Sequence, residues 1–159
     1  MAKETLPSGY LEAGSAFDSA LRKLGFRADG LLWAWDKFVS EYVLVLITRH
    51  FDHTGPTEMY RLLFAAYNES AIPAEISPFI VRLQSTQDQI AQRMLRVDAH
   101  QADGQRSQSI RFDGEVGDLK YSNHWVYYYY DPENERKIAP VDRARQWRKF
   151  RANVEQLAA

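Results

Sequence analysis

The side chains best suited to metal chemistry lie in one short stretch of the sequence, Thr48-Arg-His-Phe-Asp-His-Thr-Gly-Pro56. Within it, two imidazoles and a carboxylate come from His50, Asp52 and His53. Imidazole nitrogens and carboxylate oxygens are ligands of Zn²⁺, and bound Zn²⁺ activates water for hydrolysis. The stretch follows the most apolar run of the chain, residues 42–47, where a strand is expected to end. It is therefore a candidate for a hydrolytic metal site.

A hydrophobic strand followed by His-x-His-x-Asp-His and a glycine resembles the metal-binding turn of the metallo-β-lactamase superfamily. His50, Asp52 and His53 match that motif, whereas Thr48 stands where its first histidine is expected. The resemblance implies two zinc ions, further ligands downstream and a duplicated sandwich larger than this chain. A metal-dependent hydrolase is therefore kept as the second alternative function, and no cofactor is expected.

A structural interpretation explains the same residues as the start of a helix. Pro56 suits the first turn of a helix, where Asp52 or Thr54 would accept hydrogen bonds from free backbone N–H groups. The positive end of the helix dipole would also stabilise a carboxylate there. We therefore expect Asp52, Thr54 or the backbone geometry of Gly55 to provide the capped entry to a helix, and His50 and His53 to be polar residues at the end of a strand.

A second set of acidic groups lies in residues 111–120, which carry Asp113, Glu115, Asp118 and Lys120. Asp118-Leu-Lys120 is similar to the D/E-x-K element of PD-(D/E)xK nucleases, which implies a magnesium-binding carboxylate and a lysine that orients the attacking water. The other aspartate of that family usually lies on a preceding strand at a longer spacing than Asp113. Gly114 and Gly117 favour a solvated hairpin turn instead.

Two surfaces could bind a partner, and the first is the aromatic segment 124–131, HWVYYYYD. On a strand, side chains alternate between faces, so one face receives Trp125, Tyr127 and Tyr129, and the other receives Val126, Tyr128 and Tyr130. Burial of one face leaves the aromatic rings of the other to pair across strands or to contact a partner. We treat Tyr128 and Tyr130 as candidate binding residues.

The second surface is basic. Between positions 136 and 151 the local charge is +6 in a protein of net charge −1, because seven basic residues accompany one acid, Asp142. Four of them, on the expected last helix, are candidate binding residues for phosphate or an acidic protein: Arg143, Arg145, Arg148 and Lys149. A solvated helix face is the alternative interpretation.

The composition is that of an ordinary globular protein, with 45% hydrophobic and 26% charged residues among 159. A chain of this length can bury one core, so we expect a single domain over residues 1–159. The absence of cysteine excludes disulfides, zinc-thiolate sites, iron–sulfur clusters and cysteine nucleophiles. No signal peptide or apolar stretch near the roughly 20 residues that span a bilayer is visible, so we expect a cytoplasmic protein without membrane contact.

Hydrophobic periodicity predicts the element order α-β-β-α-β-α-β-β-α. Helices are expected from a cap at Ser8 to Gly25, along the apolar stripe at 59–67, from about 86 to 97, and from about 141 to 157. Strands are expected at 31–36, 41–49, 79–84, 109–113, 119–122 and 124–130, with a polar loop at 98–108. The unbroken apolar run at 42–47 indicates a central strand, and residues 41–84 form a β-α-β unit.

These patterns predict an α+β domain in which helices pack on a mixed sheet of about five strands. Because no complete catalytic set is visible, the first functional hypothesis is a non-catalytic protein-interaction or regulatory module. A nucleic-acid-binding protein that uses the basic last helix and the tyrosine-rich strand is the alternative. The partner would be another protein or a second copy of this chain, as a two-fold homodimer through part of residues 125–130, or else nucleic acid.

Overall fold

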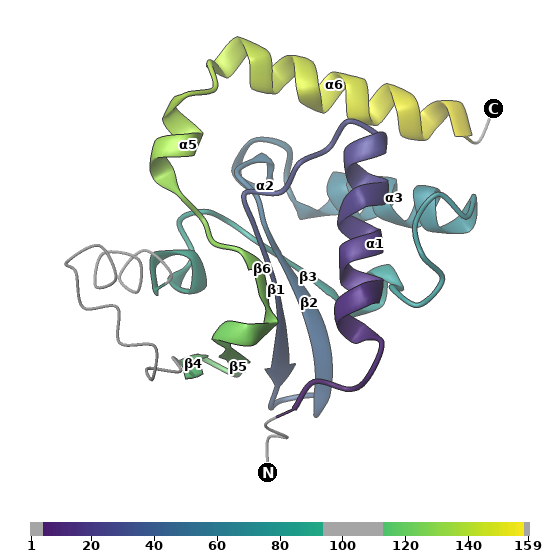
Figure 1. Cartoon of the computed structure of the whole chain (residues 1–159). Coiled ribbons are helices and arrows are strands. Elements are labelled where there is room, and N and C mark those ends of the chain that lie inside the picture. Colours follow the sequence, from purple (N-terminus) through teal and green to yellow (C-terminus); the bar gives the residue numbers. More distant parts are fainter. Residues whose placement is uncertain (1–4, 94–112, 158–159) are drawn as a thin grey trace.

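A mixed six-stranded sheet with the strand order β3-β2-β1-β5-β4 lies at the centre of the molecule, and β6 also pairs with β1 (Figure 1). The computed structural model describes residues 5–93 and 113–157. The helices are α1 (Tyr10–Lys23), α2 (His50–Thr54), α3 (Pro56–Asn68), α5 (Pro132–Arg136) and α6 (Pro140–Leu157). The strands are β1 (Gly30–Asp36), β2 (Glu41–Ile47), β3 (Val81–Gln84), β4 (Asp113–Val116), β5 (Leu119–Ser122) and β6 (Val126–Tyr128). Two 3₁₀ helices, η1 (Pro78–Ile80) and η2 (Asn123–Trp125), precede β3 and β6. The prediction of an α+β fold with a mixed sheet is confirmed.

The β1–β2 hairpin is the centre of this sheet. Its strands pair in antiparallel fashion from Gly30 opposite Ile47 to Asp36 opposite Glu41. At the turn, the Asp36 carboxylate accepts a hydrogen bond from the Phe38 backbone N–H at 2.9 Å. Residues 43–47 of β2 are fully buried. The predicted central strand is confirmed.

The predicted β-α-β unit is also confirmed, since β2 and β3 run parallel and α3 connects them. The buried stripe of α3 contains four of the predicted residues, Met59, Leu62, Leu63 and Ala66. Tyr60 on the same helix covers the free edge of β3: its hydroxyl donates to the Val81 carbonyl at 2.6 Å and accepts from the Leu83 N–H at 3.4 Å. Backbone groups that an edge strand would expose are thereby satisfied within the chain.

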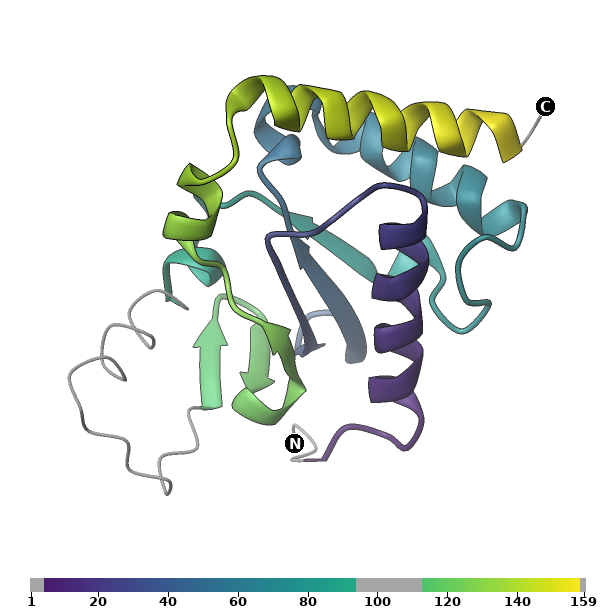
Figure 2. The same ribbon diagram turned by 45° about the horizontal axis from the view of Figure 1, so that its top comes forward.

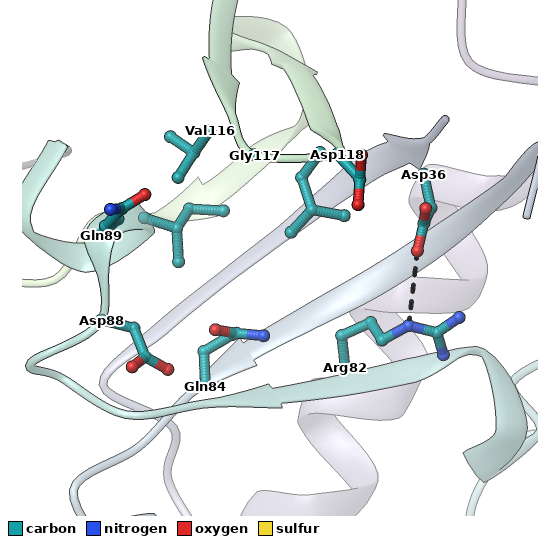
Figure 3. A pocket seen from close by; sticks show the side chains of 10 residues that line it. Asp36, Arg82, Gln84, Asp88, Gln89, Val116, Gly117 and Asp118 are labelled. Carbon is teal, nitrogen blue, oxygen red and sulfur yellow. Dashed lines mark ion pairs between the residues drawn. The ribbon is translucent and has the colours of Figure 1, made fainter. Parts of the chain in front are cut away.

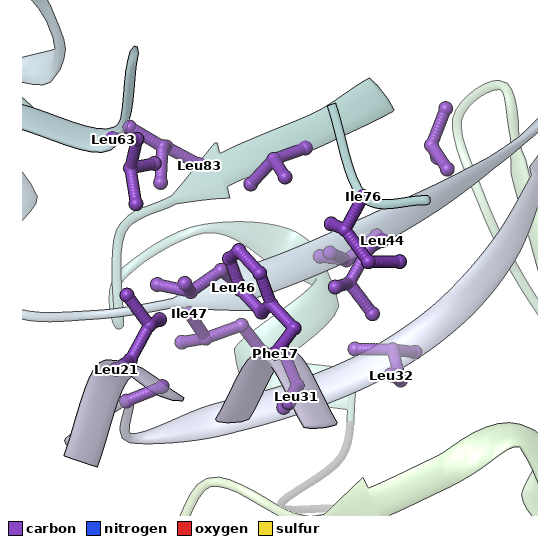
Figure 4. Close-up of a cluster of buried hydrophobic side chains, with 14 of the residues drawn as sticks. Phe17, Leu21, Leu31, Leu32, Leu44, Leu46, Ile47, Leu63, Ile76 and Leu83 are labelled. Atoms are coloured by element: carbon purple, nitrogen blue, oxygen red, sulfur yellow. The ribbon is translucent and has the colours of Figure 1, made fainter. Parts of the chain in front are cut away.

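Helices α1 and α3 cover one face of the sheet. Figure 4 shows Phe17 and Leu21 of α1 beside Leu31 and Leu46 of the central strands, and Leu63 of α3 beside Leu83 of β3. Each of these side chains is at most 6% exposed. The short helical segment 89–93 lies on the other side of the sheet from α1 in both views (Figures 1 and 2). It contributes Ile90 and Ala91 to the core.

The C-terminal helix α6 crosses one end of this assembly (Figure 2). Its Phe150 ring packs on Phe26 with 5.0 Å between ring centroids, and the Asn153 amide donates to the Leu24 carbonyl at 2.8 Å. Gly25, between these two contacts, has a φ of +97°, the left-handed conformation predicted for the end of the first helix. The corner after α1 is thus tied to α6.

Several boundaries differ from the sequence-based expectations. Gly9 rather than Ser8 precedes α1, without a side-chain capping bond. Phe79 lies in η1, so β3 begins two residues later than predicted. Only residues 126–128 of the segment predicted as a strand at 124–130 are extended as β6, and α5 was not predicted. The end of the helix expected at 86–97, the loop expected at 98–108 and most of the strand expected at 109–113 lie outside the described residues.

None of the helices in the described parts of the chain combines the length and the apolar character needed to span a membrane.

Close contact between α1 and the sheet occurs at Gly14. A Cβ atom at this position would overlap the Tyr127 hydroxyl and would lie 2.9 Å from Nε1 of Trp33. Those two side chains are themselves joined, because the Trp33 Nε1–H donates to the Tyr127 hydroxyl at 2.9 Å. The Tyr127 hydroxyl in turn donates to the Leu11 carbonyl at 2.7 Å. The absence of a side chain at Gly14 lets this network form.

We expect Gly14→Ala to lower the free energy of unfolding by about 1–3 kcal/mol, because the added methyl group overpacks a buried contact. At an uncrowded helix position the same change would raise stability by about 0.8–1 kcal/mol. Denaturant titration therefore shows whether Gly14→Ala lowers or raises the free energy of unfolding. Tyr127→Phe combined with Gly14→Ala should destabilise by less than the sum of the single changes. A stabilised Gly14→Ala variant would contradict the close contact.

Candidate functional site

A pocket of about 400 Å³ opens at the end of the sheet where β1 begins and β2 ends. Segments that are distant in sequence line it: the end of α1 and the loop after it, the residues after β2, the end of β6 and the residues after it, the connection after α5, and the start of α6. Figure 1 shows the ribbons of α1, α2, α5 and α6. Its lining residues are Arg22, Arg27, Ala28, Asp29, Arg49, His50, Tyr128, Tyr129, Asp131, Lys137, Ile138, Arg143 and Gln146. We call it the basic pocket.

The basic pocket has an excess of positive charge. Five of its lining residues are cationic and only two, Asp29 and Asp131, are acidic. The cations come from five separate segments: Arg22 from α1, Arg27 from the loop after it, Arg49 from the end of β2, Lys137 from the connection after α5, and Arg143 from α6. In a protein of net charge −1, folding rather than composition produces this concentration of charge.

Arg49 forms part of the inner wall of the basic pocket. Its residue is half-buried, and the Nε and Nη1 atoms of its guanidinium are removed from solvent. Its backbone N–H donates to Oδ2 of Asp29 at 2.9 Å. A guanidinium with little access to water interacts strongly with an anion, because little bulk water screens the charges.

Asp29 lies among the cations of the basic pocket. Burial raises its carboxyl pKa from 3.8 to about 6, although the charges of Arg143 and Arg27 act in the opposite direction. Burial likewise lowers the pKa of the Arg143 guanidinium, and Asp29 opposes that shift. The two groups therefore stabilise each other's charge in a partly desolvated place.

The Tyr128 side chain forms another wall. Its hydroxyl donates to Oδ1 of Asp18 at 2.8 Å, and the Arg22 guanidinium lies 5.6 Å from the centre of its ring. Arg22 also pairs with Asp18 at 3.0 Å. Burial raises the pKa of the Tyr128 phenol, so this side chain is neutral in the physiological range. It offers the pocket a rigid aromatic surface.

His50 also borders the basic pocket, as a neutral group. Its ring lies between Trp147 and Phe26, with centroids 5.1 Å and 5.9 Å away. Burial lowers the pKa of the imidazole to about 4, with a smaller contribution from His53. Near pH 7 His50 therefore adds no charge to the pocket.

The structure places the metallo-β-lactamase-like stretch in a helix, so the prediction that His50 and His53 lie at the end of a strand is wrong. Residues 50–54 form the short helix α2, in which Asp52 accepts a hydrogen bond from the Ser85 hydroxyl at 2.7–2.8 Å. Gly55 is the N-cap of α3 and no side chain caps this helix, so the predicted entry through the Gly55 backbone is observed and the predicted capping by Asp52 is wrong. Pro56 does occupy the first turn, as predicted. Among the described residues there is no group of three histidine, aspartate or glutamate side chains that could hold a metal ion.

The nuclease-like hairpin borders a second pocket, also of about 400 Å³ (Figure 3). Its main charged groups are Asp36, Arg82, Asp88 and Asp118. Arg82 pairs with Asp36 at 3.7 Å, and Asp88 accepts a hydrogen bond from the Ser85 backbone N–H at 2.8 Å. Figure 3 shows Asp88 on the opposite side of the pocket from Asp36. Asp118 is drawn on the same side as Asp36, so Asp88 is the carboxylate set apart from the other two.

In the same hairpin Glu115 pairs with Lys37, and it also stands opposite Lys120 across β4 and β5. Lys37 lowers the pKa of the Glu115 carboxyl. The described contacts of this hairpin therefore join it to the β1–β2 turn.

The tyrosine-rich segment does not alternate as predicted. The pairing of β6 with β1 shifts register between Leu31 and Leu32, and as a result both Tyr127 and Tyr128 reach α1. Tyr130, a candidate binding residue, is 4% exposed and belongs to the core. Tyr128, the other candidate, lines the basic pocket.

The basic residues of the last helix are also divided. Arg143 lines the basic pocket, whereas Arg145 is exposed and pairs with Asp142 at 3.6 Å. Arg148 is exposed, and the Lys149 side chain lies beside Gly25. Of the four candidate residues on this helix, the structure assigns Arg143 alone to the pocket.

Sequence reasoning missed Arg22, Arg27 and Arg49. Each follows or ends a predicted element: Arg22 is in the last turn of the first helix, Arg27 follows the glycine after it, and Arg49 ends a strand. A search for cations at the ends of predicted elements would have found them. Their convergence still depended on the order of strands in the sheet.

Comparisons of the chain with protein-family models, curated proteins and solved structures found no match.

His50 should make stability depend on pH. Its pKa is lowered from 6.5 to about 4 by folding, so the unfolded chain binds a proton more readily. We expect the free energy of unfolding to fall as the pH decreases from 6.5 to 4, by up to about 3 kcal/mol from this group. In His50→Phe the loss should be smaller by that amount. The exposed His124→Phe variant is the control, because His124 is not among the groups that shift the pKa of His50. An equal acid sensitivity of His50→Phe and wild type would contradict the burial of His50.

Proposed function

We propose that the protein is a ligand-binding module that holds a phosphorylated small molecule in the basic pocket. The observation that carries this proposal is the convergence of five cations from five segments on one cavity with two carboxylates. Cations that a fold brings together repel one another, which lowers the stability of the folded state. A bound anion offsets this repulsion.

The chemistry of the basic pocket favours phosphate. Guanidinium groups bind the oxygens of phosphate through parallel, charge-assisted hydrogen bonds. The lining holds three more cations than carboxylates, and Arg22 is paired with Asp18 outside it, so an excess of two remains. This excess suits an anion with more than one negative charge. A phosphate monoester or a diphosphate has this character.

The dimensions of the pocket favour a small molecule. A cavity of about 400 Å³ lies within the range of about 300–1,000 Å³ typical of sites for small organic ligands. Tyr128, Tyr129 and Ile138 give it apolar and aromatic wall beside the charges. Arg145 and Arg148, which a bound nucleic acid would be expected to use, do not line it.

Binding rather than a reaction is proposed because the polar groups of the pocket are engaged in positioning one another. The Tyr128 hydroxyl is directed to Asp18, and Asp29 accepts the Arg49 N–H. Such a module fits the regulatory role that the sequence favoured. A two-fold homodimer stays a prediction.

Calorimetric titration with pyrophosphate and with ATP tests the proposal. We expect saturable binding to the wild-type protein. A Lys137→Gln/Arg143→Gln variant should bind at least about tenfold more weakly, because a hydrogen bond to a charged group contributes about 1.5–3 kcal/mol. The matched control is Arg145→Gln/Arg148→Gln, which removes the same charge from the same region outside the pocket. Its affinity should change by less than about twofold, because exposed distant charges are screened by salt.

Three results would contradict the proposal. One is the absence of binding of both ligands to wild type. Another is an equal loss of affinity in the two double variants. The third is binding of single-stranded DNA that is tighter than that of ATP and lost in the Arg145→Gln/Arg148→Gln control, because that result assigns the protein to nucleic acid.

A further inference from the structure

A carboxylate inside an anion-binding pocket needs an explanation. Asp29 lines the basic pocket, yet an ionised Asp29 would repel the ligand that the surrounding cations attract. Its neighbours are also those expected to bind the ligand, since Arg27 and Arg143 are the charges that act on it. Asp29 and an anionic ligand therefore compete for the same two guanidinium groups.

We propose that Asp29 takes up one proton from solvent when an anion enters the basic pocket, so that anion binding is coupled to proton uptake. This inference rests on the proposed function of the pocket. No covalent bond forms or breaks. The neutral carboxylic acid releases Arg27 and Arg143 to the ligand, and its O–H becomes a donor to a ligand oxygen.

The position of Asp29 supports this exchange. Its Oδ2 accepts the Arg49 N–H at 2.9 Å, and its own N–H donates to the Ile47 carbonyl at 2.8 Å. Both contacts hold the residue at the wall of the pocket, and the carboxyl group can accept the Arg49 hydrogen bond in either protonation state. Protonation can therefore occur without loss of the local fold.

Burial has already brought Asp29 close to its protonation point. Its pKa is about 6, so a nearby anion needs to raise this pKa by only one or two units for much of Asp29 to be protonated at neutral pH.

Comparison with the other charged and titratable groups of the lining identifies Asp29 as the group that takes up the proton. His50 has a pKa of about 4 and stays neutral above it. Arg22, Arg49 and Lys137 are the other basic residues of the lining. Asp131, at the other acidic position, is the matched comparison for Asp29.

Trimetaphosphate is a suitable probe, because its three negative charges do not change between pH 5 and 8. We expect its affinity for the wild-type protein to fall at least about tenfold from pH 5.5 to pH 8. Calorimetry at pH 7 in buffers of different ionisation enthalpy should show uptake of about 0.4–0.8 proton per bound anion, because a pKa raised from about 6 by one or two units changes the protonated fraction of Asp29 by that amount. Asp29→Asn should bind equally well at both pH values and without proton uptake, whereas Asp131→Asn should keep both effects.

The outcomes separate the two proposals. One outcome is that trimetaphosphate binds to wild type, with the binding lost in Lys137→Gln/Arg143→Gln, but shows neither pH dependence nor proton uptake. That result overturns the role of Asp29 and leaves the phosphate-binding function standing. A coupling that persists in Asp29→Asn also overturns it. Absence of binding of trimetaphosphate, pyrophosphate and ATP at every pH overturns both. Should Asp29→Asn fail to fold, the proposal is tested by the pH dependence of affinity and the proton uptake of the wild-type protein, since the absence of both overturns it.

Discussion

The pairing of β1 with β2 is the constraint on which the rest of the structure depends. Its register places seven residues of each strand opposite one another, and β3, β5 and β6 all attach to this hairpin. A slip of one residue would turn every buried side chain of β2 toward the opposite face, where its shape would not match its new neighbours, so close packing on both faces fixes the register. Beyond the last pair, Asp29 N–H still donates to Ile47 and Arg49 N–H donates to Asp29. The wall of the basic pocket is thus a continuation of the central hairpin.

The charge distribution shows how a nearly neutral chain can form an anion site. The basic residues of the last helix are divided between Arg143, which lines the pocket, and others that pair with acids or lie elsewhere, such as Arg151 with Glu58 and Glu155. Folding adds Arg22, Arg27 and Arg49 from the first third of the sequence. Local charge along the chain is therefore a poor guide to local charge in space. The contact of α6 with the corner at Gly25 joins the two sets.

Periodicity predicted the regular elements well and the site poorly. The apolar stripe of α3, the buried run of β2 and the glycine that ends α1 each depend on burial or on local backbone preference, which neighbouring residues encode. The alternation predicted for the tyrosines failed because the shift between Leu31 and Leu32 depends on a partner strand almost a hundred positions away. Asp52 was predicted as a cap, but Ser85, brought close by the parallel pairing of β3, provides its partner. Both features depend on the pairing of strands that are distant in sequence, which a local sequence pattern does not reveal.

A crystal structure of the protein soaked in tungstate would test the central claim most directly, because this tetrahedral oxyanion resembles phosphate and scatters anomalously. The strongest anomalous peak should lie in the basic pocket, within hydrogen-bonding distance of Arg143 and of Lys137 or Arg49. Peaks confined to exposed guanidinium groups such as Arg145 and Arg148, with none in the pocket, would contradict the claim that folding has assembled an anion site there.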